Sequence, residues 1–131
     1  MISALKACLK TLPVLLFFVS LGCVTPVTPE QITNADYGTV SPTYQDSIKK
    51  YMEGVLFDPY SAHYRFFGEP AKGYAYLSGT IHPPTFGYLV HVGINAKNRM
   101  GGYVGEQPYR FFLKNDQLWI LHEYAKAEVV R

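Results

Sequence analysis

One segment of the chain repeats its apolar side chains with the period of an α-helix. Between residues 42 and 57 the apolar positions fall at i, i+4, i+7, i+8, i+11 and i+12, and polar side chains occupy the other side. The apolar positions are Tyr44, Ile48, Tyr51, Met52, Val55 and Leu56. This pattern predicts an amphipathic helix whose apolar stripe packs on a core, although such a stripe also suits a membrane surface or a partner protein.

Proline is placed near both ends of this predicted helix. Ser41 followed by Pro42 suits a helix start, because proline at the first helical position gives up a donor that has no partner there anyway. Thr43 with Asp46 three residues later is an alternative capping box. Pro59 disfavours helical geometry in the residue before it, so we expect the helix to end near residue 57.

The chain after this helix has the period-two alternation of β-strands. Residues 86–94 show it most clearly, with Phe86, Tyr88, Val90, Val92 and Ile94 on one face. The other candidate strands are residues 62–67, 73–78, 109–114 and 117–123. Asn115 and Asp116 form a suitable two-residue hairpin turn between the last two.

This order of elements predicts an α+β fold. One amphipathic helix followed by four or five antiparallel strands forms two layers, with the helix covering one face of the sheet. The chain contains 11 Tyr and 8 Phe, which predicts that the other face is not fully polar. We expect a single domain over residues 41–131.

A different kind of apolar segment lies near the start of the chain. Residues 12–23 read LPVLLFFVSLGC, two lysines precede them, and no acidic residue occurs before Glu30. A basic start followed by a short apolar run is typical of an export signal. The run is shorter than the roughly 20 apolar residues that a membrane-spanning helix needs. We therefore expect residues 1–22 to be a signal peptide.

The end of the apolar run resembles a bacterial lipobox. In that motif the cysteine becomes the acylated first residue of the mature protein, and here VSLGC ends at Cys23. Ser20 stands where the motif usually has leucine, so an ordinary signal peptide that leaves Cys23 as a free thiol is the alternative. The only other cysteine, Cys8, lies inside the signal, and a lone thiol is a liability in an oxidising compartment. Lipidation of Cys23, by acyl chains such as palmitate, is the favoured interpretation.

The residues after Cys23 predict a tether and a location. Residues 24–34, VTPVTPEQITN, have no apolar periodicity, so we expect residues 23–40 to form a lipidated tether; a first edge strand at 31–33 is the alternative. Several acyl chains suffice for stable membrane attachment. Val24 stands where an aspartate would resemble the signal for inner-membrane retention. We therefore expect an outer-membrane lipoprotein that faces the periplasm.

Removal of the signal changes the charge of the chain. The whole chain has 12 Lys and Arg against 10 Asp and Glu, a net charge of +2. Residues 1–22 contain Lys6, Lys10 and no acid. The remaining chain therefore has ten basic and ten acidic side chains and a net charge of zero. A neutral domain lacks the excess of basic residues that nucleic-acid binding requires, so no nucleic-acid partner is expected.

The sequence offers no recognisable catalytic or metal-binding motif. The four histidines are His63, His82, His91 and His122, and none has a second histidine four residues away or a cysteine nearby. Acidic residues are scattered, so no carboxylate pair is indicated. Ser61 and Ser78 lack the context of a catalytic nucleophile, and Ser61 or Asp58 is expected to cap backbone groups. We expect no enzymatic activity, no metal and no cofactor.

Residues 95–107, NAKNRMGGYVGEQ, form the candidate interaction loop. A phosphate-binding loop would open a helix and carry a lysine, but here Pro108 and a strand follow the glycines. Polar donors and aromatic side chains are concentrated around this loop, a mixture favoured at recognition surfaces. The candidate contact residues are Asn95, Lys97, Asn98, Arg99, Tyr103 and Tyr109.

Several short motifs together resemble a family of small proteobacterial lipoproteins and exported proteins. They are ADYG at 35–38, LFDPYSA at 56–62, YRF at 64–66, PAKGY at 70–74, NAKN at 95–98 and GGYVG at 101–105. The resemblance covers about residues 35–114, and the chain departs from it at 77–78 and 81–85. It implies a location in the cell envelope and a shared fold, and it assigns no functional residue.

Two functions from different classes follow. The first is a structural or assembly lipoprotein, a non-catalytic module that contacts another envelope protein. The second is a periplasmic binding module, either an inhibitor or a carrier of a small ligand, that uses residues 95–107. The sequence alone does not separate them.

Overall fold

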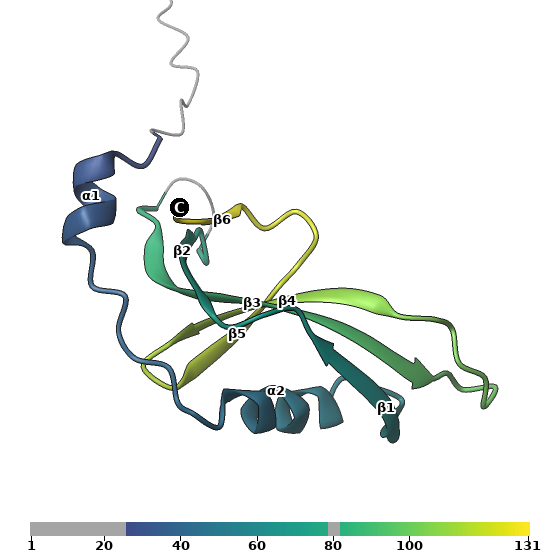
Figure 1. Cartoon of the computed structure of the whole chain (residues 1–131). Helices are drawn as coiled ribbons and strands as arrows, with labels where there is room; N and C mark the ends of the chain where they lie inside the picture. Colours follow the sequence, from purple (N-terminus) through teal and green to yellow (C-terminus); the bar gives the residue numbers. More distant parts are fainter. Residues whose placement is uncertain (1–25, 79–81) are drawn as a thin grey trace, which may run out of the picture.

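The computed structural model describes residues 26–78 and 82–131, and within them it is an α+β fold (Figure 1). The predicted signal peptide and Cys23 lie outside the described residues. The elements are helices α1 (Pro29–Asn34) and α2 (Tyr44–Glu53) and strands β1 (Asp58–Phe66), β2 (Ala71–Ala75), β3 (Thr85–Lys97), β4 (Gln107–Lys114), β5 (Gln117–Leu121) and β6 (Ala127–Val129).

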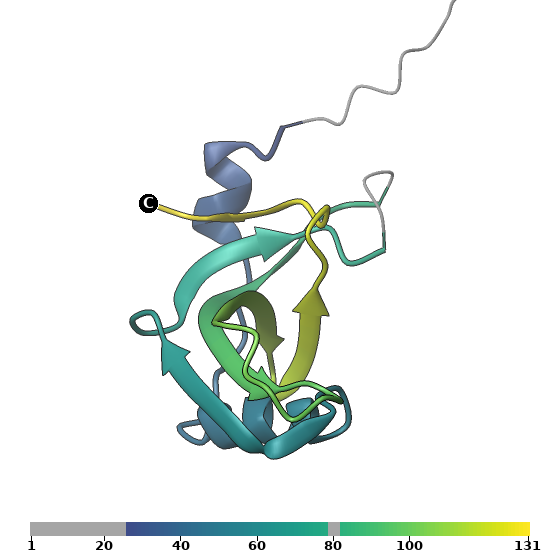
Figure 2. The same cartoon turned by 90° about the vertical axis from the view of Figure 1, so that its right-hand side faces the viewer.

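All six strands belong to one antiparallel sheet built around β3, which has 13 residues. One edge of β3 pairs with β4, and β4 pairs with β5. The other edge is shared: β1 pairs with residues 92–97 and β2 with residues 85–89. Strands β1 and β2 therefore act as two halves of one strand, interrupted at Gly68, which has a φ of +78°. The sheet is strongly curved (Figure 2).

Helix α2 covers one face of this sheet, as the apolar stripe predicts. Its buried side chains are Tyr44, Ile48 and Met52. They pack against alternate residues of the two central strands, namely Val90, Val92 and Ile94 of β3 and Phe111 and Leu113 of β4. This face carries the larger apolar core because both the helix period and the strand period direct apolar side chains to it.

A second, smaller core lies apart from the helix and confirms that the other face is not fully polar. Its buried residues are Ala75, Leu89, Phe112 and Leu121, and Leu77, Trp119, Ala125 and Ala127 pack around them. The chain after β5 returns across this region, and β6 pairs with β2. The sheet thus has six strands where four or five were predicted. Three residues are too few to show alternation, which is why β6 has no signal in the sequence.

The boundaries of the helix differ from the predicted 42–57. Helix α2 starts one residue after Thr43, whose side chain makes no capping hydrogen bond, and it ends at Glu53, before Gly54. Asp58 and Pro59 do not stop a helix; they begin β1. At this end the Gly54 N–H bonds back to the carbonyl of Tyr51 at 3.2 Å, a bond over three residues that tightens the last turn.

Part of the predicted tether is ordered. Residues 29–34, expected to lack regular structure, form α1, and Thr28 and Gln31 make a reciprocal capping box. None of the α1 residues is buried. The segment after it lies against the domain: the ring of Tyr37 meets Phe86 at 5.7 Å between centroids, and Asn115 exchanges hydrogen bonds of 3.0 Å with Thr39. Prolines at 26 and 29 obscured this short helix in the sequence.

The hairpin between β4 and β5 is as predicted. Asn115 and Asp116 have φ angles of +48° and +62°, which is the geometry of a two-residue turn with two left-handed residues. Asparagine and aspartate tolerate this conformation better than most residues. The turn also supplies the Asn115 side chain that receives the Thr39 N–H.

The link between β2 and β6 predicts a pH dependence of stability. The Tyr74 hydroxyl donates a hydrogen bond of 2.6 Å to Glu128, and burial, followed by this bond, raises the pKa of Tyr74 to about 12. Because the folded state holds this proton more tightly than the unfolded chain, the contribution is complete below about pH 10 and is lost as pH rises toward 12. We expect the unfolding free energy, measured by denaturant titration, to fall across this range.

A Tyr74→Phe variant should lose most of that decline. Tyr124→Phe is the matched control, because the ring of Tyr124 is 94% exposed. Equal slopes for Tyr74→Phe and the parent protein between pH 10 and 12 would contradict the role of Tyr74.

Candidate interaction surface

The loop between β3 and β4 is held in one conformation by Asn98. The Asn98 side-chain oxygen accepts hydrogen bonds from the backbone N–H groups of Met100, at 2.9 Å, and Gly102, at 3.2 Å. Its own backbone N–H donates to the Gly102 carbonyl at 2.9 Å. Gly101 has a φ of +78°, a conformation that favours glycine. These hydrogen bonds therefore give the loop a defined turn conformation.

Tyr103 ties the base of this loop to β1. Its hydroxyl donates to the Ser61 carbonyl at 3.0 Å and lies 3.2 Å from Nε2 of His63. The Ser61 hydroxyl donates to the Asp58 carbonyl at 2.8 Å and receives the Lys97 N–H at 2.9 Å. Ser61 therefore has the backbone-capping role that the sequence predicted. The Ser61 hydroxyl thus donates one hydrogen bond to the backbone and accepts another from it, so Ser61 is not arranged as a nucleophile.

An irregularity in β1 makes these contacts possible. Asp58 pairs with Lys97 and His63 pairs with Asn95, so β1 uses five steps where β3 uses two. The extra residues bend β1 away from the ladder, which is the usual effect of a bulge. As a result, residues 59–62 lie beside the loop, and the side chain of Tyr60 is 97% exposed.

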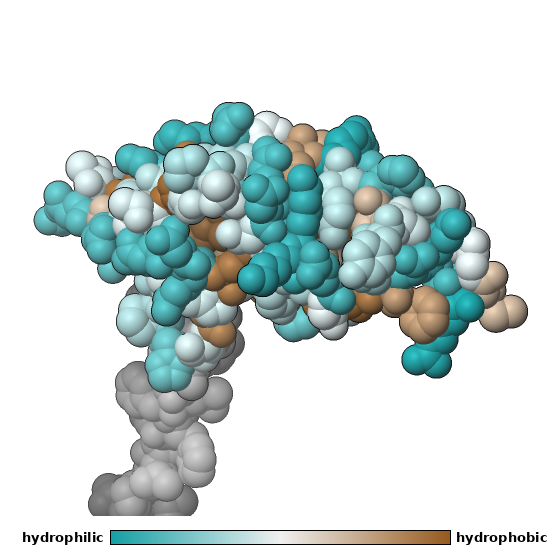
Figure 3. Space-filling model, turned by 90° about the horizontal axis from the view of Figure 1, so that it is seen from below, coloured by the Kyte–Doolittle hydropathy of each residue, from teal (hydrophilic) through white to brown (hydrophobic). Residues whose placement is uncertain are grey.

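Large apolar side chains are exposed at this end of the molecule. We define the distal surface as Phe57, Tyr60, Met100, Tyr103 and Val104, all of them exposed. The guanidinium of Arg99 lies over the Phe57 ring at 5.7 Å, and the Lys97 ammonium lies over the Tyr103 ring at 5.6 Å. Hydrophobic atoms reach the surface at this end, remote from α1 (Figure 3).

The Arg65–Glu106 ion pair braces the same end. The Arg65 Nε donates to Glu106 at 2.9 Å, and a second nitrogen of the guanidinium bonds the other carboxylate oxygen. The hydrogen bond from Arg65 holds the pKa of Glu106 below its usual value. This bidentate pair connects β1 to the residue just before β4.

The structure separates the six residues predicted for the loop. Lys97, Asn98, Arg99 and Tyr103 lie together at the distal end. Asn95 lies within β3, and its buried Oδ1 has no hydrogen-bond partner among the described residues. Tyr109 lies in β4 and packs against the core beneath α2, with its ring stacked on Phe111.

Four members of the distal surface were not among the predicted contact residues, namely Phe57, Tyr60, Met100 and Val104. Met100 and Val104 lie within the predicted loop, whereas Phe57 and Tyr60 belong to the LFDPYSA motif, to which no functional residue was assigned. Phe57 and Tyr60 lie on either side of Asp58 and Pro59. The loss of the apolar period near Pro59 was the sequence signal available for the exposure of these two side chains. The contact of Phe57 with Arg99 follows from the pairing of Asp58 with Lys97, a register that has no sequence signature.

No group of three or more His, Cys, Asp or Glu side chains lies close enough to hold a metal within residues 26–78 and 82–131. In the same part of the chain no helix is long and apolar enough to cross a membrane. The distal surface offers exposed aromatic and apolar side chains with two cations beside them.

Comparison of the chain with protein-family models, with curated proteins and with solved structures found no match.

The hydroxyl of Tyr103 gives a test of how the loop is held. Tyr103→Phe removes the bonds to Ser61 and His63 but keeps the ring, so we expect a loss of about 0.5–1.5 kcal/mol in the unfolding free energy. Amide hydrogens of Asn98 and Gly102 should exchange faster with solvent. Tyr60→Phe is the control, since the Tyr60 side chain is almost fully exposed. Unchanged exchange in Tyr103→Phe would mean that Asn98 alone organises the loop.

Proposed function

We propose that this protein is a lipid-anchored protein of the bacterial cell envelope that acts as a non-catalytic interaction module. In this proposal Cys23 carries the lipid, the membrane is the outer membrane, and the folded domain faces the periplasm. The lipobox-like sequence before Cys23 and the resemblance to small exported lipoproteins support the location.

The observation that carries the interaction role is the distal surface. Four of its members, Phe57, Tyr60, Met100 and Val104, are more than half exposed, although each would gain by leaving water. Scattered exposed apolar residues are normal, but a cluster of them at one end of a domain marks a contact site. Tyrosine, phenylalanine and methionine with a nearby arginine are the residue types enriched in protein interfaces.

The position of this surface fits an anchored domain. The described chain begins beside α1, and the loop between β3 and β4 lies at the opposite end of the molecule (Figure 1). A lipid attached at Cys23 would therefore leave the distal surface on the side facing away from the attachment point. We propose that its partner is another envelope protein, such as a component of an assembly or secretion machine.

The second candidate function, a periplasmic binding module, has support from a separate feature. An open cavity of about 820 Å³ lies on the face of the sheet away from α2, and its lining includes Gln107 of the predicted loop and Tyr109, one of the predicted contact residues. This volume is within the range of small-molecule sites. The two functions therefore use different surfaces and are separable by mutation.

The anchor is tested by mass spectrometry of the protein purified from membranes of its native host. We expect a mature N-terminus at Cys23 that carries acyl chains, and we expect Cys23→Ala to release the protein from the membrane fraction. A mature chain that starts elsewhere, or that starts at Cys23 without acyl groups, would refute the anchor and leave the distal surface as a separate question.

The interaction role is tested by photo-crosslinking in living cells. A photoreactive residue at Met100 or Tyr60 should yield one discrete adduct with an envelope protein, whereas the same residue at Lys50, exposed on α2, should not. Phe57→Asp should remove the adduct because it places a charge in the contact area. Equal adducts from positions 100 and 50, or an adduct that survives Phe57→Asp, would contradict a specific contact at this end.

A further inference from the structure

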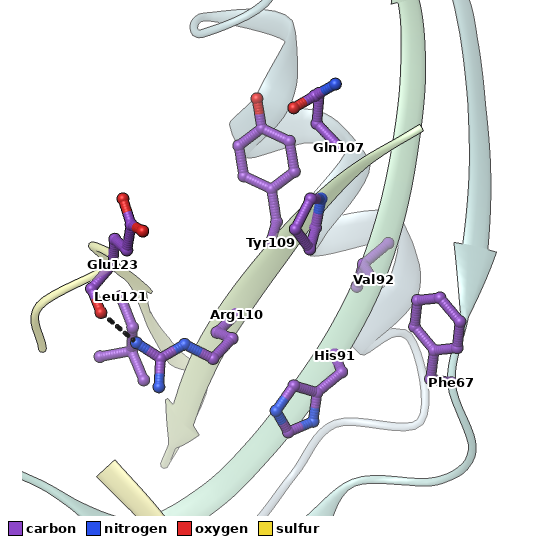
Figure 4. Close-up of a pocket in the computed structure, with 9 residues that line it drawn as sticks. Phe67, His91, Val92, Gln107, Tyr109, Arg110, Leu121 and Glu123 are labelled. Atoms are coloured by element: carbon purple, nitrogen blue, oxygen red, sulfur yellow. Dashed lines mark hydrogen bonds between the residues drawn. The ribbon is translucent and has the colours of Figure 1, made fainter. Parts of the chain in front are cut away.

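The cavity on the open face of the sheet has a composition that points to a ligand class. It is about 820 Å³ in volume and lies over β3 and β4, with β1 on one side and the chain after β5 on the other (Figure 4). Its lining includes Phe67, His91, Gln107, Arg110, Leu121 and Glu123. None of these belongs to the distal surface, so the site is separate from the proposed interaction end.

Two nitrogen-bearing side chains stand next to each other on the cavity floor. His91 of β3 pairs directly with Arg110 of β4, so their side chains leave the same face of the sheet. The imidazole is exposed and has no hydrogen-bond partner among the described residues. A histidine and an arginine side by side on one face provide several N–H donors and a permanent positive charge.

The Arg110 guanidinium is held in place by the backbone but not neutralised by an acid. Its Nη2 atom donates to the carbonyl groups of His122, Glu123 and Ala125, at 3.0, 3.2 and 3.2 Å. Within the described part of the chain, Nε and Nη1 have no hydrogen-bond partner, and no carboxylate lies within ion-pair distance of Arg110. The charge is thus pre-positioned, and part of its donor capacity remains for a ligand.

The other arginine on this face of the sheet, Arg65, is paired with an acid. Arg65 is matched by the bidentate contact with Glu106, and its guanidinium also stacks over the ring of Phe67 at 4.4 Å. The stack fixes Phe67 at the β1 side of His91 (Figure 4). Arg110 therefore differs from Arg65 in having no acidic partner.

Apolar walls flank the two polar side chains. Phe67 is 47% exposed on the β1 side, and Leu121 of β5 lies beyond Arg110. Glu123 is the one acid in the lining, and its carboxylate points away from the Arg110 guanidinium (Figure 4). The centre of the cavity consequently carries the positive charge of Arg110, with the apolar surface of Phe67 on one side and the acid at the rim.

We propose that this cavity binds a small amphiphilic carboxylate. The carboxylate accepts hydrogen bonds from Arg110 and His91, and an alkyl or aryl body lies along Phe67, whose side chain is 47% exposed. A guanidinium offers paired donors that match the two oxygens of a carboxylate, and charge-assisted bonds of this kind are the strong ones. The proposal does not depend on lipidation or on the distal surface.

Octanoate is the probe, and its two matched analogues are octanamide, which is neutral, and octylamine, which is cationic. Titration of the purified full-length protein, followed by amide chemical shifts in NMR, should show octanoate binding about tenfold more tightly than octanamide, the effect of a charge-assisted bond, with shifts at residues 91, 110 and 121. Octylamine should not bind. Octanamide binding as tightly as octanoate, or no octanoate binding up to about 10 mM, roughly the weakest affinity such a titration detects, would overturn the proposal.

Variants assign the contacts. His91→Gln and Arg110→Lys should each weaken octanoate binding about three- to tenfold, because both remove directed donors. Arg99→Lys is the matched control, because it makes the same exchange at an arginine of the distal surface and should leave binding unchanged. Glu123→Gln should tighten binding, because it removes the only acid in the lining. Equal weakening by Arg99→Lys and Arg110→Lys would show that the effect does not arise in the cavity and would refute the site.

Discussion

The pairing of β3 with strands on both of its edges is the interaction on which the rest of the structure depends. With 13 residues, β3 is long enough to bond β4 along one edge and both β1 and β2 along the other. Its alternate residues then face two different environments. Val90, Val92 and Ile94 meet α2, whereas Leu89 joins the smaller core, and His91 lies in the cavity. One strand thereby positions the core and both candidate binding surfaces.

The two surfaces arise from departures from regular pairing at opposite ends of β1. At its start, the irregularity between Asp58 and His63 brings residues 59–62 beside the loop that Asn98 organises. At its end, the Phe67 N–H still donates to the His91 carbonyl at 2.9 Å, which places Phe67 beside His91, and the pairing is interrupted only afterwards, at Gly68. Such irregularities disturb the ladder, and proteins place them where a side chain must be redirected.

The charged side chains are also placed differently at the distal surface and at the cavity. Arg65 and Glu106 satisfy each other, and Lys97 and Arg99 lie over aromatic rings at the distal end. Arg110 is held by three carbonyl groups. A nearly neutral domain can therefore present one apolar contact surface and one electropositive cavity without a large overall field.

The sequence by itself determined the α+β class, the apolar faces of α2 and β3, and the turn at Asn115 and Asp116, because each depends on local period or local backbone preference. The export signal and the lipidation of Cys23 stay predictions from sequence. Only the tertiary structure decided that β6 extends the sheet beside β2, that α1 precedes the domain, and that Tyr109 of β4 packs against the core. It also decided the grouping of Phe57 with Arg99 and of His91 with Arg110, because these pairs join residues distant in sequence through strand register and bulges, which no local pattern records.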